Sequence, residues 1–392
     1  MPWNRRGRRL PAALCPVGGS RRRGAAWSAG GSRRRGAALA TLAVAAMLAA
    51  AGCSSSNSSA PGAGQSPAPS GSGQAGNSSG SAPPGIVAVT SSGALVVLNS
   101  STGTTERTLV SSGVVGEELA VSPNGSTVYF TAGSGCSNEI ESVPASGGTP
   151  TSIASGVLPA ISPDGTKLAF AQEPWFVPTS CAASASLSPS AYVLAVRTLS
   201  TGSQSNIPMA ASTPDAGLPI PILYLSWAPD NASVAVTMSG IQDNEGWLLN
   251  ILSTTSAQYY LSGAGDTEVP VTGSPDASRS YYGEAAYLPD GNLFVNRDCC
   301  QGDDPVNPAP ADSNLMQEIS TSGSLVHQVA IGIQNNEHTS LSVNPTGNWL
   351  LYISSSQTAI SPSNVPAGTL YVSQGGAKPT ALTTGMTAAA WL

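Results

Sequence analysis

Charged residues, aromatic residues and histidines are all scarce in this chain. Charged residues make up 10% and aromatic residues 5% of its 392 residues, and the histidines number two, His327 and His338. Histidine is the side chain most often used for acid–base catalysis near neutral pH, and no serine or cysteine stands out as a nucleophile to accompany it. The sequence therefore predicts no catalytic residues.

One sign of charge is missing or rare in each part of the chain. Residues 1–52 contain ten arginines and no acidic residue, whereas residues 53–392 contain six basic and 22 acidic residues, a balance of −16. Nucleic-acid binding needs clustered lysine and arginine to meet the phosphates, and an anionic membrane surface repels so acidic a domain. The composition argues against both partners and is typical of a soluble extracellular domain; a cation or a basic partner is the sharper interpretation.

The apolar run at residues 37–51 has the length of a signal-peptide core and is short for a membrane-spanning helix. It follows three arginines and leads directly into Ala50-Ala51-Gly52-Cys53. That ending resembles the lipobox of bacterial, actinobacterial-type lipoproteins, although alanine replaces the leucine usual three residues before the cysteine. The resemblance implies that Cys53 carries a lipid, which anchors the protein on the extracytoplasmic face of the cell membrane. An ordinary cleaved signal with an incidental cysteine is the alternative.

Residues 54–84 consist almost only of Ser, Gly, Pro, Ala, Asn and Gln. Such a segment has little apolar surface to bury, so we expect a disordered tether. The sequence thus predicts a signal peptide (1–52), a lipidated cysteine with its tether (53–84) and a folded domain (85–392).

A short apolar run, a proline, turn residues and a second apolar run recur five times in the folded domain. The copies are AVSPNGSTVYF (120–130), AISPDGTKLAF (160–170), LSWAPDNASVAV (225–236), AAYLPDGNLFV (285–295) and LSVNPTGNWLLY (341–352). Strand–turn–strand units recurring at intervals of tens of residues predict an all-β repeat architecture, a β-propeller.

Each copy extends into a unit of four strands, and one segment is left at each end of the chain. The unit that begins at residues 222–227, for example, is predicted to end with a fourth strand at residues 258–261. Residues 386–392 resemble a first strand, whereas residues 86–110 supply second, third and fourth strands. Together they make a blade shared between the two termini, which closes the ring and removes a free sheet edge. The prediction is therefore a six-bladed propeller.

The hairpin turns of this chain resemble those of TolB-type, WD-like propeller repeats. The best copy is Ser162-Pro163-Asp164-Gly165, followed by Thr166, Lys167 and an apolar alternation. The resemblance covers essentially all of residues 86–392. It implies the propeller fold and says little about function, because the motif is structural.

The residue that ends each first strand is apolar or aromatic, which predicts a packing layer between neighbouring blades. These residues are Val121, Ile161, Trp227, Tyr287, Val343 and Trp391. We therefore expect Trp227 and Trp391 in the core and not on a ligand platform.

The long insertions are predicted on the face opposite the proline turns, and loops on a rigid scaffold commonly carry function. The candidate ligand-face residues are Trp175, Phe176, Asp215, Asp266, Glu268, Asp298, Asp303, Asp304, Glu337 and His338. Grouped carboxylates suit a hard cation such as Ca²⁺, and aromatic residues among them suit a sugar or a peptide. The alternative is that these are solvated loop acids, since no loop has the ligand spacing of a known calcium site.

The remaining cysteines of the folded domain favour an oxidising compartment. Cys136 and Cys181 fall in equivalent loops of neighbouring blades and are predicted to pair, which leaves Cys299 and Cys300 for a vicinal disulfide. Pairing between the two sets is the alternative.

From the sequence we expect a lipid-anchored, monomeric, non-catalytic binding or scaffold protein. It would act through its long-loop face on an unidentified protein or small molecule. The alternative is an extracellular enzyme with a calcium-assisted carboxylate site at the propeller mouth, acting on a sugar or a lactone.

Overall fold

The structure is a computed structural model. It describes residues 85–134, 137–172, 193–211, 222–239, 247–256, 259–261, 269, 280–299, 315–329, 337–356, 366–375 and 377–392. These residues form strands and turns and contain no helix, so this part of the chain has no helix that could cross a membrane. All of them belong to one compact unit, which spans Asn77–Leu392.

Three sheets consist of consecutive antiparallel strands. They contain β4 (Val114–Val121), β5 (Thr127–Ser134), β6 (Ser137–Pro144) and β7 (Thr151–Ser155); β12 (Ile222–Trp227), β13 (Ser233–Ser239) and β14 (Trp247–Ser253); and β16 (Ser280–Tyr287), β17 (Leu293–Cys299), β18 (Leu315–Ile319) and β19 (Leu325–Val329).

A fourth sheet has an unexpected fifth strand. It contains β8 (Val157–Ile161), β9 (Lys167–Gln172), β10 (Val193–Thr198), β11 (Gln204–Ala211) and β15 (Tyr259–Leu261). The sequence analysis assigns residues 258–261 to the unit that begins with β12, but β15 instead pairs parallel with β11, with Met209 opposite Tyr259. That prediction is wrong because the outer edge of β11 offers unpaired backbone groups, and so short a strand only weakly specifies its partner.

The fifth sheet joins the two ends of the folded domain. Its strands are β20 (Glu337–Val343), β21 (Trp349–Ser355), β22 (Gly368–Gln374), β23 (Thr380–Trp391), β1 (Ile86–Thr90), β2 (Leu95–Leu98) and β3 (Thr105–Val110). The first part of β23 pairs with β22 and the second part with β1, where Ile86 lies opposite Trp391. The predicted pairing of the two terminal segments is confirmed.

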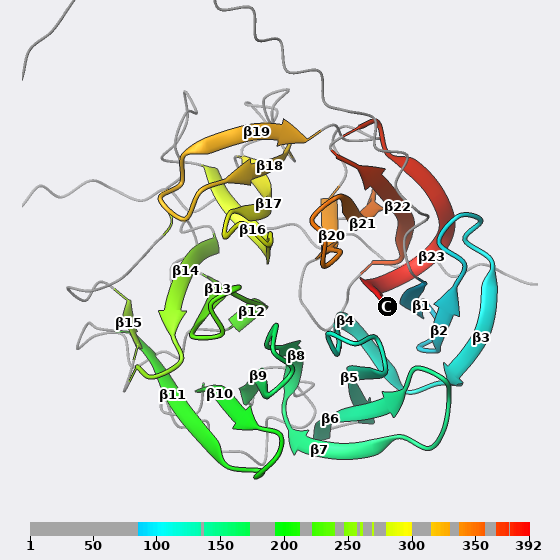
Figure 1. The fold of residues 1–392 in the computed structure, drawn as a ribbon, viewed down its shortest axis with the longest axis horizontal. Coiled ribbons are helices and arrows are strands. Elements are labelled where there is room, and N and C mark those ends of the chain that lie inside the picture. The colour runs from blue at the N-terminus through cyan, green and yellow to red at the C-terminus, as the bar shows by residue number, and fades with distance from the viewer. Residues whose placement is uncertain are drawn as a thin grey trace, which may run out of the picture. The chain divides into compact units, whose positions relative to one another are not determined.

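The sheets surround a common centre, as the blades of a β-propeller do (Figure 1). The strands β4, β8, β12, β16 and β20 and the end of β23 are innermost, and β3, β7, β11 and β19 lie outside. Buried apolar residues fill the interfaces between neighbouring sheets: Leu158 and Leu194 pack with Trp227 and Met238, for example. This burial is the main stabilising contribution to the ring.

Each first strand is connected to its second strand by a short turn. In the turn after β8, the N–H of Gly165 donates to the Ser162 carbonyl at 2.8 Å. The Asp164 carboxylate accepts a hydrogen bond from the Thr166 N–H at 2.9 Å, and Gly165 has a φ of 71°. Proline, Asx and glycine therefore each have a structural role here, as the repeat predicts.

Neighbouring turns also touch one another around the central opening. A Cβ added to Gly165 would lie 3.2 Å from Cδ of Pro123 in the preceding turn, and one added to Gly347 would lie 3.1 Å from Cδ of Pro289. The glycine of one turn thus makes room for the proline of the turn before it.

Replacing these glycines tests that contact. We expect Gly165→Ala and Gly347→Ala each to lower the free energy of unfolding by about 1–2 kcal/mol, since both a positive φ and the proline oppose a Cβ. Gly291→Ala is the matched control, because φ is 91° there but nothing lies within 4 Å of the added Cβ. Denaturant unfolding that showed equal losses at all three positions would contradict a role for the proline contact.

Candidate binding cavity

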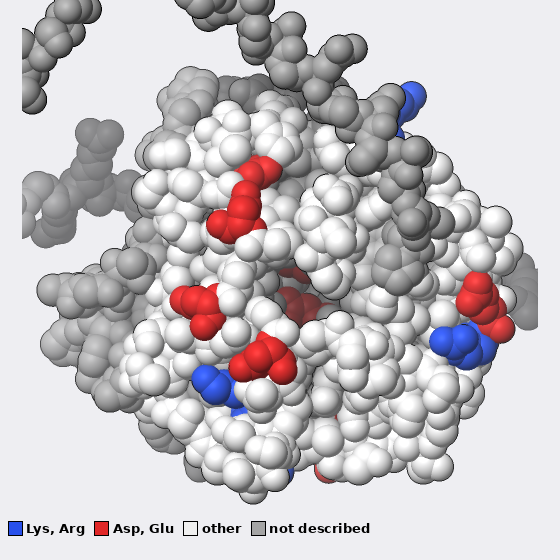
Figure 2. Space-filling model, in the orientation of Figure 1, with Lys and Arg blue, Asp and Glu red and all other residues white. Residues whose placement is uncertain are grey.

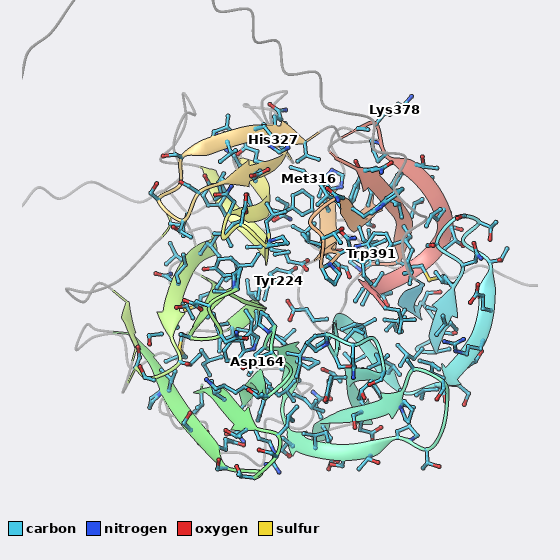
Figure 3. The ribbon with its side chains drawn as sticks, in the orientation of Figure 1. Asp164, Tyr224, Met316, His327, Lys378 and Trp391 are labelled. Atoms are coloured by element: carbon cyan, nitrogen blue, oxygen red, sulfur yellow. The ribbon has the colours of Figure 1, made fainter. Side chains whose placement is uncertain are left out.

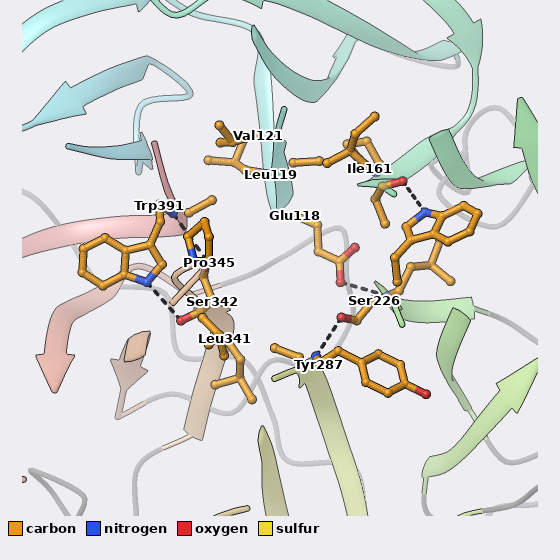
Figure 4. Close-up of a pocket in the computed structure, with 18 of the residues that line it drawn as sticks. Glu118, Leu119, Val121, Ile161, Ser226, Tyr287, Leu341, Ser342, Pro345 and Trp391 are labelled. Atoms are coloured by element: carbon orange, nitrogen blue, oxygen red, sulfur yellow. Dashed lines mark hydrogen bonds between the residues drawn. The ribbon is translucent and has the colours of Figure 1, made fainter. Parts of the chain in front are cut away.

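The innermost strands enclose a cavity of about 430 Å³ that opens among the proline turns. Its walls come from the last residues of β4, β8, β12, β16, β20 and β23, together with Pro123, Pro163 and Pro345 of the turns. Figure 2 shows this opening as a hollow at the centre of the face, and Figure 4 shows the residues around it. The volume lies in the range of small-molecule sites.

Small residues at one repeated position make this space. The position directly precedes the apolar residue that ends each first strand, and it holds Ala120, Ala160, Ser226, Ala286, Ser342 and Ala390. A larger side chain at this level would fill the opening.

The two tryptophans at the ends of β12 and β23 hold neighbouring inner strands together. The Trp227 indole N–H donates to the Ala160 carbonyl of β8 at 2.8 Å, and that of Trp391 donates to the Ser342 carbonyl of β20 at 3.3 Å (Figure 4). Both side chains are buried. The prediction that they belong to the core is confirmed.

Side chains of one inner strand accept hydrogen bonds from the backbone of another. The Ser226 hydroxyl accepts from the Tyr287 N–H at 3.0 Å, and the Ser340 hydroxyl accepts from the Ala389 N–H at 2.6 Å. Each first strand is the inner edge of its sheet, so these N–H groups have no further strand to pair with. The side chains supply the missing acceptors.

Two carboxylates in the cavity have the same role. Glu284 of β16 accepts hydrogen bonds from the backbone N–H groups of Ser340 and, at 2.7 Å, of Leu341. Glu118 of β4 accepts one from the Leu225 N–H of β12 at 3.0 Å (Figure 4). Both side chains are buried, with 4% of Glu284 and 7% of Glu118 exposed. The pairing of β4 with β5 and of β16 with β17 shifts in register at the positions of Glu118 and Glu284. Such an irregularity breaks the strict alternation of side chains between the two faces of a strand.

Burial controls the protonation of Glu284. Desolvation raises the pKa of Glu284 from 4.5 to about 8, against the lowering effect of the Leu341 and Ser340 amides. Burial, with a smaller contribution from the charge of Asp230, also raises the pKa of Tyr287 to about 12.

The charged residues that line the cavity are acidic, and the rim is mainly acidic, with the charge of Lys167 acting on Asp164. Among the described residues that line the cavity, Glu118 and Glu284 are acidic and none is Lys, Arg or His. Asp164, Asp230 and Asp290 follow the prolines of three consecutive turns, and Figure 2 shows acidic groups both around the hollow and inside it.

The turns also keep two rim aspartates ionised. Hydrogen bonds from the Ser162 hydroxyl and the Thr166 amide lower the pKa of Asp164. Burial opposes the effect at Asp230, but hydrogen bonds from Ala232 and Ser233 leave its pKa below the ordinary value.

Most of the candidate ligand-face residues lie outside the described residues. These are Trp175, Phe176, Asp215, Asp266, Glu268, Asp303 and Asp304, and the same holds for Cys53, Cys136, Cys181 and Cys300. The backbone of Asp298 and Cys299 belongs to β17 and that of Glu337 to β20. The disulfide pairings and the calcium site stay predictions; among the described residues no group of three or more His, Cys, Asp and Glu could hold a metal.

The sequence analysis places His338 in a long loop. In the structure it is instead a buried residue of β20. Its ring meets that of Tyr352 edge-on, with centroids 5.2 Å apart, and only 1% of the residue is exposed. Within the described structure neither ring nitrogen has a hydrogen-bond partner, and burial lowers the pKa of His338 to about 4. A neutral, buried imidazole here contributes to packing.

His327 is a surface residue of the outer strand β19 (Figure 3). Its Nδ1 lies 2.8 Å from a carboxylate oxygen of Glu318.

The sequence analysis missed Glu118 and Glu284. A signal for them exists, because each stands five residues before the proline of its turn, at Pro123 and Pro289. Two acidic residues at one position of a repeat that otherwise holds apolar or neutral residues would have identified the pair.

Comparisons with known proteins bear on the fold alone. No protein-family model matches the sequence, and no curated protein sequence does. Solved structures similar to this chain include TolB from Acinetobacter baumannii, with 15% identity, a TM-score of 0.49, and coverage of 78% of this chain and 65% of that one.

Two more similar structures have comparable scores. A protein assigned as TolB from Agrobacterium tumefaciens has 16% identity, a TM-score of 0.49, and coverage of 78% of this chain and 90% of that one. The Cps50 (Swd1) β-propeller domain from Myceliophteria thermophila has 11% identity, a TM-score of 0.40, and coverage of 76% and 82%. The protein is a β-propeller, as its own sheets and their arrangement define it.

The two buried titratable groups predict how stability depends on pH. A raised pKa means that Glu284 stabilises the fold below pH 4.5 and that this contribution is lost as the pH rises to about 8. A lowered pKa means that the contribution of His338 is present above pH 6.5 and is lost as the pH falls to about 4. Between pH 6.5 and pH 8 the contribution of His338 to stability is therefore constant, and that of Glu284 changes with pH.

In that interval we expect the free energy of unfolding to fall by about 2 kcal/mol as the pH rises. Chemical denaturation at several pH values measures it, and Glu284→Gln should remove the slope. A flat profile in the wild type, or a slope that persists in the variant, would contradict the protonation assigned to Glu284.

Proposed function

We propose that the protein is a lipid-anchored, non-catalytic binding protein of the extracytoplasmic face, which holds a small molecule in the central cavity of a six-bladed propeller. The observation that carries the proposal is the central cavity with two buried carboxylates and no basic side chain among its described lining residues.

The count of six blades is supported by the inner strands and by the core. The seven-stranded sheet counts as two blades that share β23, since β22 pairs with its first part and β1 pairs with its second part. The buried apolar residues form six clusters, and each cluster joins two neighbouring blades.

Membrane anchoring is supported by the sequence around Cys53 and by the composition of residues 54–84. A flexible chain of this kind and length has an r.m.s. span of roughly 30 Å, enough to separate the domain from the lipid surface. The domain begins at Gly85, whose carbonyl accepts a hydrogen bond from the Leu392 N–H at 2.8 Å.

Binding in the cavity is supported by its construction. Rigid strands surround it on all sides, small residues leave it open, and buried polar groups converge at its walls. The long-loop face, which the sequence analysis favours, stays a second candidate surface for a protein partner. The enzyme alternative gains no specific observation from the described residues.

Replacing Cys53 tests the anchor. In the host, Cys53→Ser should move the protein from the membrane fraction to the soluble extracytoplasmic fraction, because a serine cannot carry the thioether-linked lipid. Fractionation with immunodetection and intact mass measure it. Unchanged membrane retention, with no lipid mass on the wild type, would contradict the lipoprotein assignment.

Filling the cavity tests the binding site. We expect Ala286→Leu to abolish most of the binders that ligand-observed NMR detects in a set of neutral, cationic and anionic fragments, because the larger side chain occupies the space. Ala381→Leu, the same change at an exposed position, is the matched control and should retain them. Binders that survive equally in both variants would place binding elsewhere.

A further inference from the structure

We propose that the cavity takes an organic cation, a protonated amine or a guanidinium, whose charge is balanced by Glu118 and Glu284. This inference rests on the proposed binding function and names the class of ligand.

The two carboxylates approach the cavity from different sides. Glu118 belongs to β4 and Glu284 to β16, and Figure 1 shows these two strands across the centre from each other. The backbone amides that hold the carboxylates also belong to different strands, Leu225 to β12 and Leu341 to β20. A ligand in the cavity is therefore flanked by acceptors from opposite walls.

The rest of the cavity lining adds to the preference for a cation over an anion. The lining position directly before the end of each first strand holds only alanine and serine, the other lining residues are mostly apolar, and the described lining contains no basic side chain. Charges interact strongly where water is largely replaced by protein, so a cation would be favoured and an anion opposed.

Hydrogen-bonding geometry favours an organic cation over a metal ion. Backbone N–H groups already donate to both oxygens of Glu284 and to one oxygen of Glu118, so they compete with a metal for the carboxylate lone pairs. Calcium also needs six to eight oxygen ligands, and the lining supplies two acidic side chains. An ammonium or guanidinium group carries several donors and can share these acceptors.

The rim would draw such a ligand in. Asp164, Asp230 and Asp290 belong to consecutive turns, and Figure 2 shows acidic groups on one side of the opening. Acidic groups at the mouth of a cavity raise the local concentration of cations. The charge of Lys167, which acts on Asp164, offsets part of this effect.

Proton release is the distinctive consequence of this arrangement. Burial keeps Glu284 protonated near neutral pH, and a bound cation favours the ionised form, so the carboxyl proton leaves to solvent as the ligand binds. Among the described side chains of the strands around Glu284, the other ionisable groups are Glu118, Tyr224, Tyr282, Tyr287, Arg297 and His338. The backbone of Glu117, Tyr281, Asp298, Cys299 and Glu337 belongs to the same strands. Of the described groups, His338 is already neutral at this pH.

The test compares benzylamine, benzyl alcohol and benzoate, which share a ring and differ in charge. Calorimetric titration of the full chain should give at least tenfold tighter binding of the amine than of the alcohol, and no binding of benzoate. Glu118→Gln and Glu284→Gln should each reduce the amine affinity toward that of the alcohol and leave the alcohol affinity unchanged. Glu139→Gln, at an exposed position of β6 away from the cavity, is the control and should change the amine affinity less than threefold.

Titration in two buffers of different ionisation enthalpy needs no variant and keeps the proposal testable if a glutamate variant does not fold. Amine binding near pH 7 should release a proton, and alcohol binding should not. Equal proton release for both, or an amine affinity no higher than that of the alcohol, would overturn the proposal. Displacement of the amine by one equivalent of Ca²⁺ in the wild type would overturn it in favour of a metal site.

The outcomes separate this inference from the proposed function. If alcohol or benzoate binds, Ala286→Leu abolishes this binding and the amine is not preferred, the inference of a cationic ligand is overturned and the cavity remains the binding site. If Ala286→Leu reduces the binding of none of these probes and of no fragment in the set, both the cation inference and the proposed binding function are overturned.

Discussion

The unpaired inner edges of the first strands are the constraint on which the rest of this propeller depends. Every first strand has a second strand on one side and the central opening on the other, so some of its backbone N–H groups have no ladder partner. A buried donor without an acceptor costs about 1–3 kcal/mol. Side chains of other blades meet this need: Ser226 for Tyr287, Glu284 for Leu341 and Ser340 for Ala389. These contacts connect neighbouring inner strands and so hold them in register.

The same contacts make the centre of the molecule polar, which joins structure to function. A serine acceptor adds no charge, but Glu118 and Glu284 place two carboxylates in a space that alanine and serine leave open. Backbone geometry cooperates at this level, because Ser340 has a φ of 56° and Leu158, at the equivalent position of β8, a φ of 58°. Such conformations in non-glycine residues are uncommon and concentrate at functional sites. Residues that satisfy the inner edge are thus also those available to a ligand.

The parts of the structure that the sequence predicts are those set by local chemistry. Proline, Asx and glycine at fixed spacing determine the turns, and the apolar position before each turn correctly placed Trp227 and Trp391 between sheets. The pairing of residues 86–90 with the end of the chain followed from counting strands. The cavity could not be found this way, because it depends on which residues of six distant segments meet at the centre. For the same reason His338 was expected in a loop, whereas β20 carries it into the core, and β15 was assigned to the wrong sheet.

Amide hydrogen exchange tests the role of the inner edges most directly. The account predicts that the N–H groups of Leu225, Tyr287, Leu341 and Ala389 exchange as slowly as ladder amides of β5 and β9, because side-chain acceptors protect them as strand pairing would. Residue-specific exchange rates measured by NMR on the folded domain within the full chain provide the comparison. Fast exchange at these four amides, with slow exchange in β5 and β9, would show that the inner edges are open to water and contradict the account.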